Sequence, residues 1–319
     1  MLTSILYIII GLAGLIFGGD WLVDGAVGIA QRAKLSPMVI GLTIVAFGTS
    51  APEFLVSLQS AIGGNPGIAL GNVIGSNIAN IALILGITAL IHPVPVHGTT
   101  TRIDAPFLFL GTLALTAICY FSDAINRVEG IIGILLLVCF VAYQIKTSKA
   151  VDNANTNADE NANTDTAATI PLWRALLLLA IGIAALKYGA QFLVDGSVTI
   201  ARTLGVDDRI IGLTIVAIGT SLPELFSSVI AARKGSVDLA IGNVIGSNLF
   251  NIMCVLAASC AIQPIDLTLV GSVTTDCLWM LGLTALIWLQ LRTDYRLSRS
   301  EGGVLIIIYT AFIILTIIS

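Results

Sequence analysis

Ten apolar stretches run along this chain of 319 residues, separated by turn residues or by charged residues. Most of them approach or exceed the roughly 20 residues that a helix needs to cross a bilayer. Their limits are 2–30, 37–62, 68–91, 104–122, 128–146, 172–201, 209–232, 238–262, 271–291 and 302–318. Because the bilayer core offers no water to the backbone, stretches as continuous as these cross it as helices. The pattern predicts an all-α polytopic membrane protein with ten transmembrane helices.

The composition excludes a soluble domain. Charged residues make up 11% of the chain, less than half of the roughly 25% that is usual in soluble proteins. The net charge is −4, so no excess of basic residues is available for binding nucleic acid. The expected partner is the lipid bilayer, and no obligate protein partner is evident from the sequence.

Lys and Arg residues indicate the orientation, because loops on the cytoplasmic side of a membrane carry an excess of them. With the N-terminus outside, eleven Lys and Arg residues lie in inner loops or at inner helix ends, and three lie outside. This distribution predicts a multi-pass protein of the cell (inner) membrane with both termini outside and the central segment in the cytoplasm.

An internal repeat relates the two halves of the chain at a constant offset of 171 residues. The string GLTIVAFGTS at 41–50 returns as GLTIVAIGTS at 212–221, and NVIGSN at 72–77 returns unchanged at 243–248. Each copy contains five predicted spans, which is an odd number, so the copies must cross the membrane in opposite directions. Inverted repeats of this kind are typical of secondary transporters.

The segment between the copies has a different composition. Residues 147–171 are rich in Asn, Asp, Thr and Ala and offer little for a folded core to bury, which is typical of a flexible linker. The sequence thus predicts three parts: a first five-helix repeat at 1–146, a cytoplasmic linker at 147–171, and a second, inverted repeat at 172–319.

Two acidic residues related by the repeat lie well inside predicted spans. Glu53 stands in GTSAPEF and Glu224 in GTSLPELF. An ionisable side chain inside a span is costly and usually serves a function. These two glutamates are therefore the first candidates for a functional site.

Further polar groups accompany each glutamate. Thr49 and Ser50 lie four and three residues before Glu53, which places all three on one helical face. Pro52 cannot donate a backbone hydrogen bond, so carbonyl groups near Ala46 to Gly48 are expected to be free.

The second copy repeats the arrangement with Thr220, Ser221 and Glu224, and with carbonyl groups near Ala217. Carboxylate, hydroxyl and carbonyl oxygens around a broken helix are the ligands that hard cations prefer. Together the two copies predict a cation site near the middle of the membrane.

The third and eighth predicted spans add neutral polar residues at a spacing of four. The four that we expect to contribute oxygen ligands are Ser76, Asn80, Ser247 and Asn251. Asn72 and Asn243 continue the same faces, but hydrogen bonding between helices would explain them equally well. Glycines at 71, 75, 242 and 246 are expected to let helices approach closely.

These motifs resemble those of the sodium/calcium exchangers of prokaryotic type, within the cation/Ca²⁺ exchanger superfamily. GLTIVAFGTSAPEF with GNVIGSNIANI, and GLTIVAIGTSLPELF with GNVIGSNLFNI, are similar to the two alpha-repeats of that family. The resemblance covers nearly the whole chain. One departure is that some relatives have Asp at the position of Asn251, so this chain has two strong acids at the centre and no evident third.

The resemblance implies a secondary active antiporter that exchanges Na⁺ for Ca²⁺ by alternating access. It also implies that the first and sixth helices slide as a pair across the other eight. The residues that it assigns to cation coordination are Glu53, Glu224, Thr49, Ser50, Thr220, Ser221, Ser76, Ser247, Asn80, Asn251 and the carbonyl groups of Ala46 and Ala217.

Other functions fit the residues less well. An H⁺-coupled antiporter would use the same two acids, but the surrounding neutral oxygens suit Na⁺ and do nothing for a proton. A passive cation channel would not account for a paired site within inverted repeats. The sequence contains no HExxH motif, no nucleotide-binding loop and no His near Ser50 or Ser221. We therefore expect no enzymatic activity and no cofactor, with Ca²⁺ and Na⁺ as transported substrates.

Overall fold

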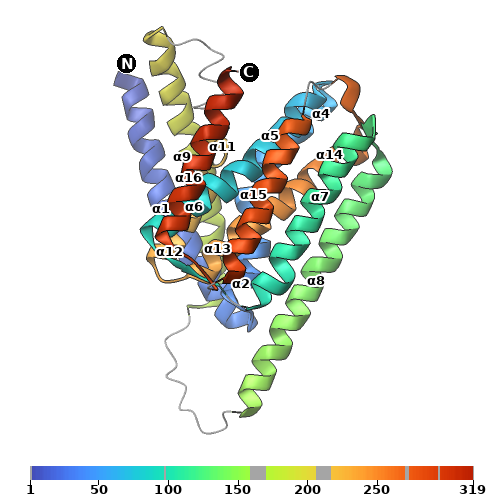
Figure 1. Ribbon diagram of the computed structural model, residues 1–319. Coiled ribbons are helices and arrows are strands. Elements are labelled where there is room, and N and C mark those ends of the chain that lie inside the picture. The colour runs from blue at the N-terminus through green and yellow to red at the C-terminus, as the bar shows by residue number, and fades with distance from the viewer. Residues whose placement is uncertain are drawn as a thin grey trace.

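Long apolar helices make up most of the molecule (Figure 1). The computed structural model describes residues 2–96, 98–158, 170–205, 217–269, 273–293 and 295–318. Among these residues, eight helices are long and apolar enough to cross a membrane, and a pair of helices bent by 49° makes a ninth candidate. The stretch expected at 209–232 is described only from Ala217 onward, so its first part lies outside the described residues. A helical, multi-pass architecture is confirmed.

The helices of the first half follow the expected stretches closely. They are α1 (Leu2–Ala33), α2 (Pro37–Ile40), α3 (Ala46–Thr49), α4 (Ala51–Ile62), α5 (Pro66–Ile78), α6 (Leu85–Ile91), α7 (Ala105–Phe121) and α8 (Arg127–Ala158), with π-helical segments η1 (Gly41–Val45), η2 (Ala79–Ile84) and η3 (Thr100–Asp104).

Where it is described, the second half has the same order of helices, and the positions equivalent to α2 and η1 lie outside the described residues. Its described elements are α9 (Leu172–Thr203), α11 (Ala217–Thr220), α12 (Leu222–Arg233), α13 (Val237–Phe250), α14 (Ala257–Ile262), α15 (Thr274–Thr293) and α16 (Arg299–Ile318), with the π-helical segment η5 (Asn251–Leu256) and the short 3-10 helix η6 (Leu267–Leu269).

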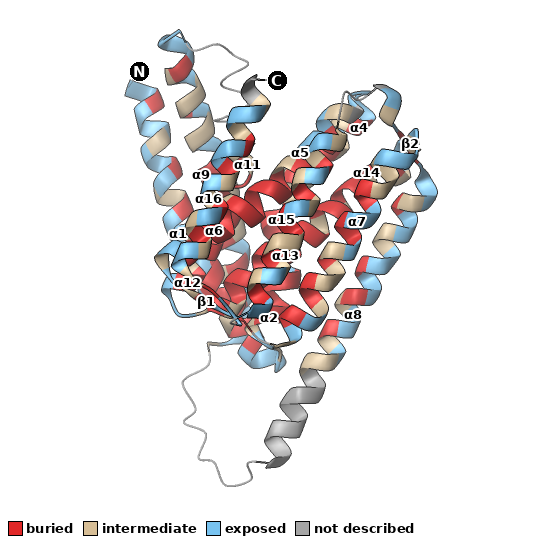
Figure 2. Cartoon of the chain, viewed as in Figure 1, coloured by how far each residue is buried: buried red, intermediate tan, exposed pale blue. Residues whose placement is uncertain are grey.

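Two continuous helical rods form the centre of the molecule. They are α5–η2–α6 and α13–η5–α14, and 72% of the apolar window of each is buried, against 28% for α1 and α9. Figure 2 shows buried residues gathered on these rods and exposed residues on the outer helices. Many exposed residues of the outer helices are large and apolar, including Leu6, Ile9 and Phe17 of α1. An outer surface of this kind is suited to lipid.

Helices α1 and α9 lie side by side along most of their length (Figure 1). Glycines make this contact close: a Cβ atom at Gly25 would lie 2.5 Å from the backbone nitrogen of Leu179, and one at Gly182 would lie 2.5 Å from that of Leu22. Backbones in such direct contact interdigitate and do not shift easily past each other. The two helices therefore form one rigid pair.

The helix that contains Glu53 is broken at Ser50, as the sequence predicts. Ser50 has φ −81° and ψ 7°, outside the helical range, and lies between α3 and α4. Ser221 has φ −90° and ψ 4° between α11 and α12. In each copy a proline lies in the first turn of the following helix, where the missing backbone N–H costs nothing. The same local sequence thus produces the same break twice.

Two short antiparallel sheets join the halves of the chain. Strand β1 (Val94–Pro95) pairs with β4 (Arg296–Leu297), and β2 (Ala124–Ile125) pairs with β3 (Ile265–Asp266). Strands β1 and β2 lie at opposite ends of the molecule (Figure 2). Each end of the molecule therefore has a two-stranded sheet, with one strand from each half of the chain.

Helix α8 extends into the segment that is predicted to be the linker. Helix α8 continues to Ala158, although residues 147–171 are predicted to be flexible. The reason is that no Gly or Pro occurs between Gly133 and Pro171 to end the helix. Residues 159–169 lie outside the described residues.

Candidate cation site

Both repeat-related glutamates lie at the centre of the molecule. Glu53 and Glu224 are each 1% exposed. Each glutamate lies in the first turn of its helix, α4 or α12, directly after the break. The partial positive charge of a helix N-terminus stabilises a carboxylate at that position.

The two copies meet at these breaks. Ser50 Oγ, from the first copy, donates a hydrogen bond of 3.0 Å to Oε1 of Glu224 in the second copy. Thr49 Oγ1 donates a second hydrogen bond across the copies, 3.3 Å long, to Oδ1 of Asn243. The predicted hydroxyl ligands of one copy are therefore close to the acid of the other.

The central rods complete the site by packing crosswise. Helix α4 packs against η5, which begins with Asn251, and α12 packs against η2, which contains Asn80. Asn80 is 1% exposed and Asn251 is fully buried. Both asparagines lie in π-helical segments, which often mark functional positions. The helix that carries each glutamate thus packs against the polar segment of the opposite copy.

Unpaired oxygen atoms are concentrated at this site. Eight buried side-chain atoms have no hydrogen-bond partner among the described residues, and all eight are oxygens. They are Glu53 Oε2, Glu224 Oε2, Asn80 Oδ1, Asn251 Oδ1, Ser221 Oγ, Ser247 Oγ, Asn248 Oδ1 and Gln290 Oε1. Six belong to residues that the sequence predicts as ligands. Since a buried oxygen without a partner costs about 1–3 kcal/mol, these six oxygens are suited to binding cations.

One predicted ligand group is engaged elsewhere. The carbonyl oxygen of Ala46 accepts a hydrogen bond of 3.0 Å from the backbone nitrogen of Ser50 and one of 3.4 Å from Thr49 Oγ1. Pro52 lacks the N–H that would bond the carbonyl of Gly48, four residues earlier, and therefore does not free Ala46. In the second copy, Ala217 is the first described residue of α11, and Ser221 N donates to the carbonyl of Ile218.

Asn72 and Asn243 tie helices together within each copy. Asn72 Nδ2 donates to Ser57 Oγ at 2.9 Å, and Asn243 Nδ2 donates to Ser228 Oγ at 3.0 Å. Ser57 and Ser228 are themselves related by the repeat offset of 171 residues. The sequence left open whether Asn72 and Asn243 continue the ligand faces or form hydrogen bonds between helices. The structure shows hydrogen bonds between helices.

The remaining predicted ligands lie on the same elements. Ser76 is 5% exposed on α5, Ser247 is fully buried on α13, and Thr220 is half-buried at the end of α11. Within the described residues, no group of three or more His, Cys, Asp or Glu side chains is placed to hold a metal ion. The site therefore depends on two acids and many neutral oxygens.

Sequence reasoning missed two residues at the centre. Asn77 and Asn248 are each 1% exposed or less and follow the predicted serines directly. Asn77 Nδ2 donates to the backbone carbonyl of Asn248 at 3.3 Å, and Asn251 Nδ2 donates to Asn77 Oδ1 at 3.1 Å. Both residues belong to the repeated string NVIGSN. Their repetition is the sequence feature that could have identified them.

The four repeat glycines differ in their surroundings. A Cβ atom at Gly242 would lie 2.5 Å from the carbonyl oxygen of Met38, and one at Gly246 would lie 2.5 Å from that of Leu42. The expected close approach is therefore present in the second copy. Gly71 and Gly75 meet no atom of the described residues within 4 Å, and the equivalent facing segment at 209–213 lies outside them.

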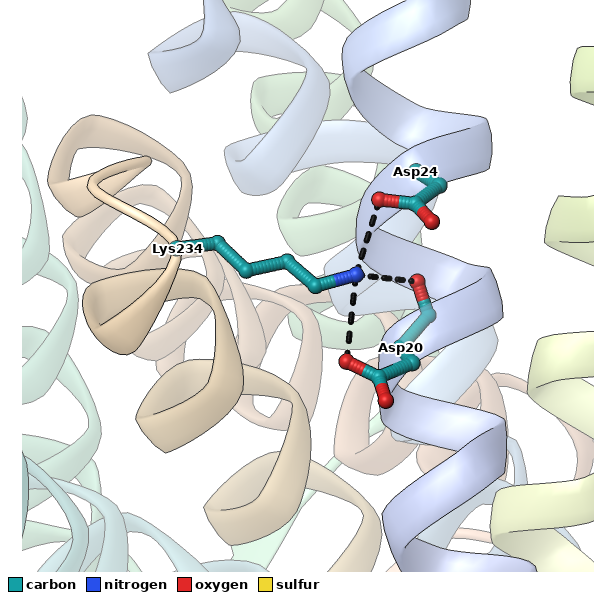
Figure 3. A network of polar contacts seen from close by, with 3 residues as sticks. All are labelled: Asp20, Asp24 and Lys234. Atoms are coloured by element: carbon teal, nitrogen blue, oxygen red, sulfur yellow. Dashed lines mark hydrogen bonds and ion pairs between the residues drawn. The ribbon is translucent and has the colours of Figure 1, made fainter.

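A second polar cluster connects α1 with α12. Lys234 Nζ lies 3.1 Å from Oδ1 of Asp20 and 2.8 Å from Oδ1 of Asp24, and it also donates to the backbone carbonyl of Asp20 (Figure 3). Partial burial lowers the pKa of Lys234, but the hydrogen bonds and charges of Asp24 and Asp20 outweigh it and raise the pKa above its ordinary value. In the first copy, Gly63 occupies the position equivalent to Lys234.

A multi-pass bundle with a buried pair of carboxyl groups, surrounded by hydroxyl and amide oxygens from both halves, defines a membrane transporter of cations. The family profile described as "Sodium/calcium exchanger protein" matches residues 3–146 and 174–318. The chain belongs to this family.

Relatives cover nearly the whole chain. The putative antiporter CaxA of Alkalimonas amylolytica is 39% identical over 317 residues, which is 98% of each protein. The sodium/calcium exchanger MaX1 of Methanosarcina acetivorans is 31% identical, again over 98% of each. A structure of the sodium-calcium exchanger NCX_Mj, soaked with Na⁺ and Ca²⁺, superposes with a TM-score of 0.83 at 30% identity over 97% of this chain and 96% of that chain.

Proposed function

We propose that this protein is a secondary active antiporter that exchanges Na⁺ for Ca²⁺ across the membrane by alternating access. The observation that carries the proposal is the set of unpaired buried oxygens around Glu53 and Glu224, contributed by both halves of the chain. Family membership and the relatives that are named sodium/calcium exchangers support the same function.

The chemistry of the site favours Na⁺ over H⁺ as the coupling ion. Ca²⁺ is a hard dication that takes six to eight oxygen ligands, and two carboxylates balance its charge. Neutral oxygens such as Ser221 Oγ and Asn251 Oδ1 do nothing for a proton but are suitable ligands for Na⁺. Ca²⁺ and Na⁺ would then compete for overlapping ligands, so exchange requires only that the site face each side in turn.

The site in this proposal contains the residues predicted from the sequence. Glu53 and Glu224 supply the charge, and oxygens of Thr49, Ser50, Ser76, Asn80 and their repeat equivalents complete the coordination. We also place the carbonyl groups of Ala46 and Ala217 at the Na⁺ positions, which requires the Ala46 carbonyl to exchange its present hydrogen bonds for a cation.

We further propose ten spans arranged as two inverted five-helix repeats, at 1–146 and 172–319, joined by the cytoplasmic segment 147–171. The sheets support this arrangement, since β1 and β3 lie at equivalent positions of the two copies and at opposite ends of the bundle. Both termini lie at one end and the end of α8 at the other (Figure 1). The excess of Lys and Arg in the predicted inner loops supports a location of the α8 end on the cytoplasmic side of a cell membrane.

The test is uptake of ⁴⁵Ca²⁺ into proteoliposomes that contain the purified protein and are loaded with Na⁺ or with choline at equal pH. We expect uptake only in the Na⁺-loaded vesicles. Uptake that ignores internal Na⁺ and follows an imposed pH gradient would replace Na⁺ with H⁺ as the coupling ion. Uptake that persists without any counter-ion would identify a channel.

A further inference from the structure

Two hydrogen bonds link three buried asparagines across the halves of the chain. Asn77 Nδ2 donates to the backbone carbonyl of Asn248, and Asn251 Nδ2 donates to Oδ1 of Asn77. All three residues are 1% exposed or less. At such burial, each bond determines which way a side-chain amide points.

A main-chain group sets the direction of these two hydrogen bonds. A backbone carbonyl can only accept a hydrogen bond, so the Asn77 amide must present Nδ2 to Asn248. Its Oδ1 then faces Asn251, which must present Nδ2 in turn. Consequently, the other end of the Asn251 amide is an oxygen, and this Oδ1 is one of the buried atoms without a partner among the described residues.

The orientation of Asn251 matters because its amide has two unlike ends. The oxygen carries a partial negative charge and attracts a cation, whereas the NH₂ group is a donor and repels one. A carboxylate at this position would offer two equivalent oxygens and would need no orientation. An asparagine at a cation site needs a neighbour that fixes which end faces the ion.

We propose that Asn77 is a positioning residue of the cation site, which holds the Asn251 carboxamide so that its Oδ1 faces the transported cation. This inference rests on the proposed function and adds a residue outside the predicted ligand set. The role is not shared by the equivalent residue of the second copy, because Asn248 Nδ2 donates to the Val244 carbonyl of its own helix at 3.0 Å.

The experiment is a double-mutant cycle on the purified full-length protein. Ca²⁺ affinity is obtained by fitting the rise in thermal unfolding temperature with Ca²⁺ concentration to the linkage relation, for wild type, Asn77→Ala, Asn251→Ala and the double variant. We expect Asn77→Ala to weaken Ca²⁺ binding about two- to tenfold, since the lost hydrogen bond joins two neutral amides. Because Asn77 acts through Asn251, the double variant should bind no more weakly than Asn251→Ala alone.

Two controls separate positioning from a general loss of packing. Ser259→Ala deletes a buried hydroxyl that bonds only within its own helix, and it should leave Ca²⁺ affinity unchanged. Asn77→Asp keeps an acceptor toward Asn251, although it loses the donor to the Asn248 carbonyl, so in that background Asn251→Ala should still cost affinity. If Asn77→Ala does not fold, Asn77→Asp provides the test.

Three results would overturn the inference: wild-type Ca²⁺ affinity in Asn77→Ala, additive losses in the double variant, or no cost of Asn251→Ala in the Asn77→Asp background. Failure of the proposed function is recognised separately. In that case the wild-type protein itself shows no Na⁺-dependent ⁴⁵Ca²⁺ uptake and no Ca²⁺-dependent rise in unfolding temperature.

Discussion

Ser50 and Glu224 are 174 residues apart in the chain and are joined by a hydrogen bond of 3.0 Å at the centre of the molecule. Each residue lies at a helix break that its own half produces through a proline. The bond therefore aligns the two breaks with each other. It also means that neither half of the chain contains a complete site.

Loss of this bond should affect the protein even without cations. We expect Ser50→Ala to lower the unfolding temperature of the Ca²⁺-free protein, because the substitution leaves Oε1 of Glu224 without its donor. Ser221→Ala is the matched variant, since Ser221 Oγ has no partner among the described residues. Both variants should weaken Ca²⁺ binding, but only Ser50→Ala should be less stable when Ca²⁺ is absent. Equal unfolding temperatures would contradict this prediction.

The two glutamates should be indispensable for exchange. Glu53→Gln and Glu224→Gln each remove a negative charge that Ca²⁺ requires, and we expect Na⁺-dependent ⁴⁵Ca²⁺ uptake to fall to the level of empty vesicles. Glu129→Gln is the control, because Glu129 accepts a hydrogen bond from Asn126 N in an exposed turn. Wild-type uptake by either site variant would show that the site is assigned wrongly.

Release of α1 from α12 should change turnover moderately. Lys234→Gln removes both ion pairs to Asp20 and Asp24, and exposed pairs contribute about 0.2–1 kcal/mol each. We expect turnover to rise about two- to fivefold if the α1–α9 pair moves against the core during exchange. Asp24→Asn should have a similar effect, and high salt should reduce the difference from wild type. Arg233→Gln serves as the neighbouring control; an unchanged rate in Lys234→Gln would show that these pairs do not limit movement.

The close packing of α1 and α9 should not tolerate a single methyl group. The Cβ atom of Gly25→Ala would lie 2.5 Å from the backbone nitrogen of Leu179, so the helices must separate and the unfolding temperature should fall. Gly282→Ala makes the same change in α15, where no atom of the described residues lies within 4 Å. That variant should be neutral or more stable by about 0.5–1 kcal/mol. Similar unfolding temperatures for the two variants would show that α1 and α9 adjust readily.

The central linker should tolerate shortening. Deletion of residues 155–164 removes only polar chain and spares Ile170, whose carbonyl accepts a hydrogen bond from Arg32. We expect wild-type ⁴⁵Ca²⁺ uptake, because the two halves are already held together by packing and by the two sheets. Complete loss of uptake in a correctly inserted protein would assign a regulatory or structural role to this segment.

Local sequence was sufficient to predict the features that depend on local rules. The helix limits follow from apolar length, the breaks at Ser50 and Ser221 follow from the proline two residues later, and the equivalence of Glu53 and Glu224 follows from the repeat. Six of the eight unpaired buried oxygens belong to residues that were chosen from the repeat, from helical spacing and from the family resemblance.

Contacts between the halves could not be predicted in the same way. Asn77 is one residue from Ser76, so an ideal helix places it about 100° away from the predicted ligand face. Its partner Asn251 belongs to the other half of the chain, and no spacing rule relates two distant segments. The ion pairs of Lys234 were missed for the same reason, since Gly63 at the equivalent position gives no indication of them.

The pairing of strands has a consequence for biosynthesis. Val94 of β1 pairs with Leu297 of β4, so the ribosome must add about 200 residues after β1 before its partner exists. At about 5–20 residues per second, β1 waits on the order of 10–40 s with its backbone unpaired. The first half is thus inserted in the bilayer as an incomplete intermediate. The sheet of β1 and β4 can form only after α15 has been made.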